Sequence, residues 1–164
     1  MNTGVLLGAL LFATGADAQD DKPGPFVQGR WRFHVLGGGG SFSGNTYFVL
    51  GGGVSHFILT GLELGVDVEQ WFGNPRIAKL SPQIRYILPL PGVINPYVGG
   101  FYRRWFYSGG EDFNTVGGRA GIMYLGGRNV FLGAGIVVEK LLSCDSTFSD
   151  CRAIYPEISV SVSF

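Results

Sequence analysis

The sequence predicts an all-β fold, an eight-stranded antiparallel up-and-down transmembrane β-barrel, and three observations support this. Apolar and polar side chains alternate with period two in eight separate stretches, as they do in strands with one apolar face. Charged residues are only 15% of the chain and aromatic residues are 14%, whereas a soluble β domain carries more charge on its surface. After the N-terminal region, no stretch has a helical period or the ~20 consecutive apolar residues of a spanning helix.

The first residues have the pattern of a secretory signal peptide. Val5–Ala13 is apolar, and a small-x-small sequence, Ala-Asp-Ala, ends at residue 18. About ten apolar residues are too few for a membrane anchor, the alternative reading of this segment. We therefore predict a signal peptide at residues 1–18, a periplasmic N-terminal linker at residues 19–26 and a barrel at residues 27–164.

The first four strands are predicted from their alternating apolar positions. In residues 27–36 every second position from Trp31 is apolar, and the run GGGGSFSGN that follows is predicted to be a loop. Residues 46–55 alternate less clearly because three glycines interrupt them. In residues 62–70 and 79–88, aliphatic side chains alternate with charged or polar ones.

The last four strands follow in the same way. Residues 97–107 carry aromatic side chains and an arginine on both faces, so the orientation of this strand stays open. Residues 115–124 set apolar side chains opposite an arginine, and residues 130–140 set them opposite a glutamate. The last eight residues, EISVSVSF at 157–164, alternate without a break.

The charged side chains on the polar faces distinguish a barrel in lipid from a soluble, lipocalin-like barrel, the alternative at the level of fold. A soluble barrel would turn its polar face outward and carry many lysines and glutamates. Here arginine dominates the bases, and acids and bases nearly balance, so a narrow barrel can enclose them as ion pairs and leave its apolar face to lipid. The residues expected to form lumenal ion pairs are Arg30, Arg32, Glu63, Asp67, Glu69, Arg85, Arg119, Glu139 and Glu157.

Aromatic clusters are expected at both membrane interfaces. If odd-numbered strands run outward from the periplasm, residues 71–72 and 105–107 lie at the outer ends, where an aromatic girdle belongs. Tyr124 and Phe164 then lie at the periplasmic interface. The segments PLPGVIN and LGGRN become periplasmic turns, and His56 is expected at another such turn.

The two cysteines, Cys144 and Cys151, lie seven residues apart in an outer loop of an exported chain. This pattern predicts a disulfide, with two free thiols as the alternative. A metal site would need more ligands. We predict no metal site and no cofactor.

With its signal peptide, the stretches NPYVGGFYRR and VGGRAGIMY, and a final strand that ends in Phe164, the chain resembles the small eight-stranded outer-membrane barrels of Gram-negative bacteria, the OmpA-type and OmpX-like group. The resemblance implies a location in the bacterial outer membrane, contact with outer-membrane lipid, and recognition of the strand ending in Phe164 by the barrel-assembly machinery. A monomer is expected. The formal net charge of zero gives no indication of a nucleic-acid partner.

The resembled group includes anchors, adhesins and small-solute carriers. We predict a non-enzymatic barrel that contributes to envelope integrity or to surface interaction with an extracellular partner through its outer loops. The alternative is a narrow channel or carrier for small or hydrophobic solutes. A third hypothesis, a lipid-modifying enzyme, would need His34 to meet a serine and an acid at the outer rim, for which Ser41, Ser43 and Asp112 are the candidates.

Overall fold

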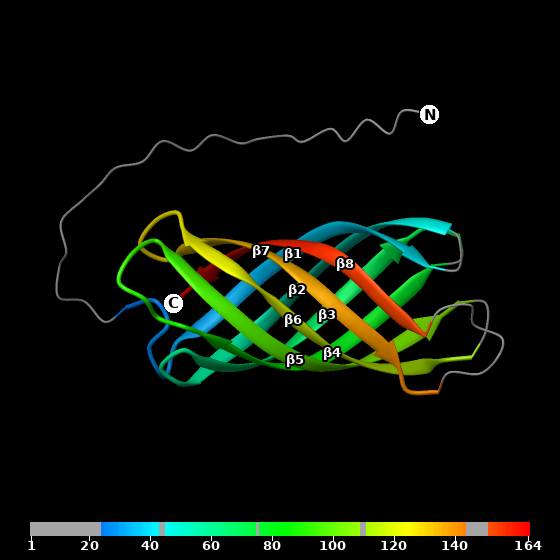
Figure 1. The fold of residues 1–164 in the computed structure, drawn as a ribbon, viewed down its shortest axis with the longest axis horizontal. Coiled ribbons are helices and arrows are strands. Elements are labelled where there is room, and N and C mark those ends of the chain that lie inside the picture. The colour runs from blue at the N-terminus through cyan, green and yellow to red at the C-terminus, as the bar shows by residue number, and fades with distance from the viewer. Residues whose placement is uncertain (1–23, 43–44, 75, 109–110, 144–150) are drawn as a thin grey trace, which may run out of the picture.

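The computed structural model describes residues 24–164 except 43–44, 75, 109–110 and 144–150. The described residues form a closed barrel in which each strand pairs antiparallel with its neighbours in the sequence and the last strand pairs with the first (Figure 1). The predicted fold class is confirmed. The strands are β1 (Trp31–Phe42), β2 (Asn45–Leu59), β3 (Leu62–Phe72), β4 (Ile77–Ile87), β5 (Ile94–Tyr107), β6 (Phe113–Leu125), β7 (Val130–Leu141) and β8 (Arg152–Ser163).

The barrel has two ends, which we call the base and the rim. The base is the end where β1 begins and β8 ends, and it carries the connections at residues 60–61, 88–93 and 126–129. The rim is the opposite end. The segments PLPGVIN and LGGRN therefore both lie at the base, the end at which the sequence pattern placed them.

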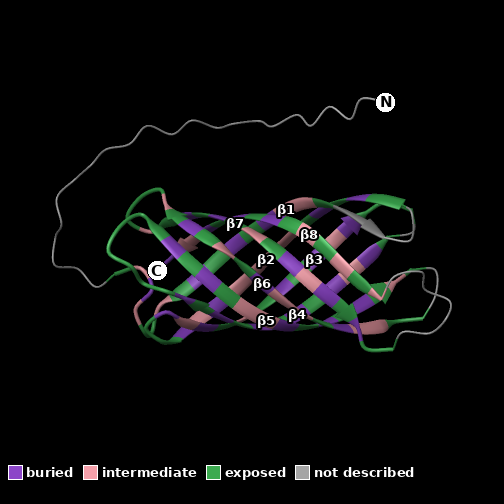
Figure 2. Ribbon diagram, in the orientation of Figure 1, coloured by how far each residue is buried: buried purple, intermediate pink, exposed green. Residues whose placement is uncertain are grey.

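The barrel is polar inside and apolar outside. Buried and exposed residues alternate along the strands, with interruptions at glycines such as residues 51–53 of β2 (Figure 2). The outward side chains of Val35, Ile136 and Ile158 are more than half exposed, while Arg32 and Asp67 are fully buried. This distribution suits a barrel surrounded by lipid, because closure satisfies the backbone while the outer face meets hydrocarbon. It supports the predicted location in the bacterial outer membrane. No helix of the described residues is long and apolar enough to cross a membrane.

The glycine run at the rim is part of a strand, and the prediction of a loop there was wrong. Residues 37–40 continue β1 and pair with residues 47–50 of β2. Glycine has a low strand propensity of its own, so the hydrogen bonds of the neighbouring strand decide this segment. Pairing with β3 extends β2 to Leu59, and pairing with β1 places His56 opposite Trp31, where the two rings lie 4.7 Å apart. The predicted turn at His56 was therefore also wrong.

The segment before β1 fills the base of the barrel. Residues 27–30 precede the strand, which begins at Trp31 and not at the predicted residue 27. Phe26 is buried, and its ring centroid lies 6.0 Å from that of Phe57 and 5.0 Å from that of Phe131. The chain ahead of β1 thus contributes an aromatic ring to the interior. The signal peptide predicted at residues 1–18 lies outside the described residues.

Candidate functional site

The barrel interior contains a balanced set of charges. Among the described residues, five cationic and five acidic side chains are buried. Equal numbers leave the enclosed volume without a net charge, which lowers the cost of removing these groups from water. They are Arg32, Lys79, Arg85, Arg103, Arg119, Glu63, Asp67, Glu69, Glu139 and Glu157.

The layer nearest the base is centred on Glu63 of β3. Arg32 of β1 donates to this carboxylate through Nε, at 2.8 Å, and through Nη2. Ser55 of β2 donates to it at 2.9 Å, and Nε of Arg85 on β4 lies 3.5 Å from Oε1. A bidentate contact between a guanidinium and a carboxylate is a strong geometry for such an ion pair. Four neighbouring strands are therefore joined through one acid.

The middle layer is centred on Asp67, also on β3. It accepts a hydrogen bond from Gln83 and lies 2.9 Å from Nε2 of His34. Arg119 of β6 reaches across the lumen with Nη1, which donates to Asp67 at 3.2 Å and to Glu157 of β8 at 3.3 Å. One guanidinium thus connects strands on opposite walls.

The rim layer is centred on Arg103 of β5, a residue that the sequence analysis did not include. Arg103 donates to Glu69, to Glu139 at 2.9 Å, to Ser81 at 2.6 Å and to the hydroxyl of Tyr155 at 2.6 Å. Its partners come from β3, β4, β7 and β8. No sequence signal separates it from Arg104, because aromatic residues lie on both faces of this strand.

Lys79 was also missed, although it alternates with the polar residues of β4. Its Nζ lies 3.5 Å from the ring centroid of Trp71 and 3.2 Å from that of Trp105. Within the described part of the chain no hydrogen-bond partner reaches this nitrogen. The ammonium is held between two indole faces, an arrangement that is worth more when water is excluded.

The two tryptophans correct the predicted outer girdle. Trp71 and Trp105 are 2% exposed, and their indoles donate to Glu69 at 3.1 Å and to Glu139 at 2.8 Å. Their neighbours Phe72 and Phe106 point outward and are 46% and 40% exposed. Adjacent residues of a strand face opposite sides, so Phe72 and Phe106 can reach the interface, whereas Tyr107 packs inside the barrel like the two tryptophans.

Apolar side chains close both ends of this charge network. At the base they are Phe26, Phe57, Ile87, Tyr97, Met123 and Phe131. Towards the rim they are Leu36, Tyr47, Val49, Trp71, Ile77 and Trp105. An eight-stranded lumen is just wide enough for side chains to fill it. The charges therefore occupy the middle of a packed interior.

The remaining predicted residues lie elsewhere. Arg30 precedes β1, is half-buried and donates to Asn129 at 3.3 Å. His34 contacts Asp67 inside the lumen, whereas Asp112 lies at the rim and pairs with Arg104. Ser43 lies outside the described residues, and nothing is described of the side chain of Ser41.

The two predicted features near the end of the chain have different outcomes. Cys144 lies outside the described residues, so its bridge to Cys151 stays a prediction. The ring of Phe164 is 67% exposed at the base, and Tyr124 is 38% exposed. The edge of the Phe164 ring packs against Phe33, with centroids 6.0 Å apart.

Comparison with known proteins supports the fold. No family model and no curated protein matches the sequence. The crystal structure of the N-terminal β-barrel domain of Pseudomonas aeruginosa OprF aligns with a TM-score of 0.63 and 17% identity over 84% of this chain and 98% of that chain. Neisserial surface protein A (NspA) aligns with a TM-score of 0.62 and 18% identity over 82% of this chain and 96% of that chain. The resemblance inferred from the sequence is confirmed at the level of structure: this chain has the fold of the small eight-stranded outer-membrane β-barrels.

Proposed function

We propose that this protein is a non-enzymatic outer-membrane barrel with a closed lumen. It contributes to the integrity of the envelope, and its rim connections contact the cell's surroundings or an extracellular partner. The observation that carries the proposal is the charge network, in which four arginines and five carboxylates lie between two apolar clusters and Lys79 lies between two indoles of the rim-side cluster.

The geometry of the network favours a structural role over conduction. Arg103 and Arg119 each span the lumen and contact acids on different strands. A permeating ion would have to separate these pairs and then pass between the indoles around Lys79. Separating buried, hydrogen-bonded charges is costly.

We expect the purified wild-type barrel to show little steady conductance in a planar lipid bilayer. The reason is that side chains fill the lumen and apolar clusters close both of its ends. Single-channel recording at several salt concentrations provides the measurement. Arg119→Ala is the comparison, because it removes a crossing guanidinium and should produce a small leak.

The opposite result would support the alternative function, a narrow channel or carrier. Robust wild-type channels whose ion preference changes in Arg119→Ala would show that the charges line a path for ions. The proposed closed lumen would then be wrong, while the fold would be unaffected.

We also propose that Phe164 belongs to the signal that the barrel-assembly machinery recognises. Its backbone pairs with Trp31, since each amide donates to the other's carbonyl at 3.2 and 2.9 Å. Phe164→Ala keeps this backbone pairing and removes only the ring. We expect a severalfold smaller fraction of folded barrel in the outer membrane, measured by heat-dependent migration on gels.

Phe33→Ala is the matched control for this prediction. Phe33 is 51% exposed, and its ring packs against that of Phe164, so either substitution removes the same contact. Equal losses from the two variants would attribute the effect to packing and exclude a specific role of Phe164 in assembly.

A further inference from the structure

The pairing between β1 and β8 stops before either strand ends. It runs from Arg32 opposite Ser163 to Gly37 opposite Ile158. β1 nevertheless continues to Phe42, and β8 has already begun at Arg152. We call residues 38–42 of β1 and residues 152–157 of β8 the seam. Over this stretch β1 pairs only with β2, and β8 pairs only with β7.

Proline explains where the ladder stops. Trp31 and Phe164 exchange both backbone hydrogen bonds, and such pairs recur at every second position of an antiparallel ladder. Continuing the register beyond Gly37, the next pair of this kind would be Gly39 with Pro156. Proline has no N–H to donate, so the ladder loses a bond at this position.

A second proline shows that a missing donor is not sufficient. Pro82 lies within β4, and the β4–β5 pairing is interrupted beside it but resumes, with Leu80 opposite Arg104 and Gln83 opposite Phe101. At the seam, β1 begins with Gly38 to Gly40, which have no side chains that could pack across to β8. Cross-strand side-chain contacts stabilise a sheet, and their loss together with the missing bond accounts for the seam.

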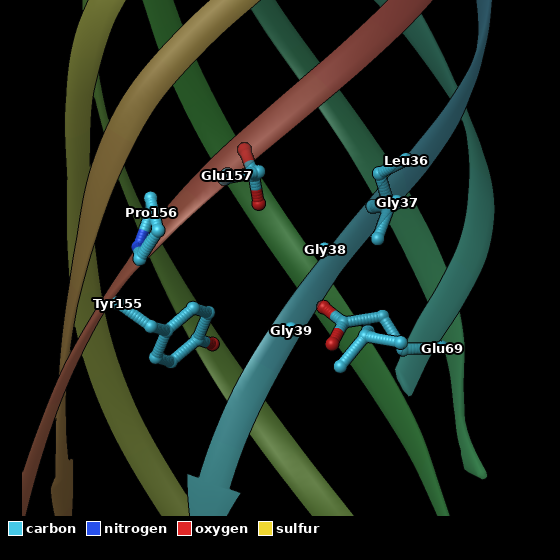
Figure 3. Close-up of a pocket in the computed structure, with 9 residues that line it drawn as sticks. Leu36, Gly37, Gly38, Gly39, Glu69, Tyr155, Pro156 and Glu157 are labelled. Carbon is cyan, nitrogen blue, oxygen red and sulfur yellow. The ribbon is translucent and has the colours of Figure 1, made fainter. Parts of the chain in front are cut away.

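A small pocket lies just inside the seam (Figure 3). Figure 3 shows Tyr155 and Glu157 of β8 across the pocket from Gly38 of β1, with Glu69 of β3 at its side. Leu36 and Val49 supply apolar lining. The pocket has room for about one water molecule.

The surroundings of the pocket indicate what it could bind. On the outer face, Ile154 and Ile158 flank the seam and are 61% and 60% exposed to the side where lipid lies. On the inner face, the charged groups that line the pocket are the carboxylates of Glu69 and Glu157. A molecule that entered from the bilayer would therefore meet apolar side chains first and hydrogen-bond acceptors last.

We propose that the seam is a lateral binding site for a single-chain amphiphile from the membrane, with an uncharged or cationic head group that donates hydrogen bonds. The chain would lie against Ile154 and Ile158, and the head would donate to Glu69 or Glu157. Each carboxylate oxygen accepts more than one hydrogen bond, so their pairs with Arg103 and Arg119 can persist. An anionic head would face two carboxylates and is disfavoured.

Entry needs the strands to separate only where no ladder bond crosses. Between Gly38 and Phe42 the structure pairs β1 with β2 alone. From Gly37 towards the base, the ladder between β1 and β8 remains intact and holds the barrel closed. The site thus depends on local widening and leaves the lumenal network in place.

Three amphiphiles that share one chain test this proposal: dodecylamine, dodecanol and dodecanoate. Each is titrated at neutral pH into isotope-labelled protein in non-ionic micelles while backbone amide signals are followed by NMR. We expect saturable shifts at Gly38 and Tyr155 with dodecylamine and dodecanol, and none at Trp31 near the base. Dodecanoate should bind more than about tenfold more weakly, because its charge repels the carboxylates.

Two variants close the site in different ways. Pro156→Val restores the N–H that can donate to the carbonyl of Gly39. Gly38→Val places a side chain at the seam, because a Cβ on residue 38 would lie 3.6 Å from the carbonyl oxygen of Pro156. Both should abolish the saturable shifts. Pro82→Val, the matched control, should leave them unchanged because the β4–β5 ladder already resumes.

Each other outcome overturns the site. Equal shifts with all three head groups would indicate partition into the micelle only, and tighter binding of dodecanoate would reverse the proposed head-group chemistry. Binding that survives in both seam variants, or that is lost equally in Pro82→Val, would place the ligand elsewhere. None of these results depends on whether the lumen conducts, so the proposal can fail independently of the proposed function.

Discussion

Replacing Arg103 with methionine is expected to lower the free energy of unfolding by about 3 to 5 kcal/mol, the usual cost of removing one partner from a buried ion pair. Arg103 is fully buried and donates to Glu69, Glu139 and Tyr155. Methionine retains much of the volume but none of the donors, so two enclosed carboxylates lose their cation. Equilibrium unfolding by urea in lipid vesicles measures the difference.

The neighbouring arginine provides a matched control. Arg104 lies on the same strand but faces outward, and it pairs with Asp112 at 3.3 Å with side chains that are 55% and 38% exposed. An exposed pair of this kind contributes about 0 to 1 kcal/mol, so Arg104→Met should change stability little. Equal effects of the two substitutions would show that Arg103 does not hold the network together.

The second large effect is expected from a single methyl group. At Gly121 of β6 an added Cβ would overlap the carbonyl oxygen of Ala134 and lie 2.6 Å from Cα of Gly135 and 2.9 Å from the Tyr97 hydroxyl. Two of these atoms belong to the backbone of β7 and cannot move without shifting the strand. We expect Gly121→Ala to cost about 1 to 3 kcal/mol, the range for overpacked sites, measured by the same urea unfolding.

Gly118 is the control on the same strand. The nearest heavy atom to a Cβ there would be the carbonyl oxygen of Gly99, at 3.5 Å. This is an ordinary van der Waals contact. Gly118→Ala should therefore stay within about 0.5 kcal/mol of the wild type. A comparable loss at both glycines would attribute the effect to strand propensity and contradict the close approach at Gly121.

Period-two alternation, together with the near balance of acids and bases on the polar faces, was sufficient to predict the barrel and most of its lumen from the sequence. In β1, β3 and β4 one face is apolar and the other is charged, so Arg32, Glu63 and Arg85 could be assigned to the interior. Successive side chains of a strand point to opposite sides of the sheet. The face on which a residue lies therefore follows from its position along the strand.

The same rule could not orient β5. Arg103 and Arg104 are adjacent and chemically identical, and aromatic residues lie on both faces of the strand. Alternation determines which residues share a face but does not say which face is inside. The structure decides this because Arg103 meets acids from two other strands once the barrel closes.

Strand length and the partners of each charge also depended on the tertiary structure. Residues 37–40 are glycines without local strand preference, and they are extended because β2 offers them hydrogen bonds. Asp67 and Arg119 are distant in sequence and meet only across the closed lumen. The sequence determined the two faces of the sheet through local geometry. Closure of the barrel decided the ends of the strands, the ion pairs and the seam, because each of these depends on which distant backbone or side chain lies opposite.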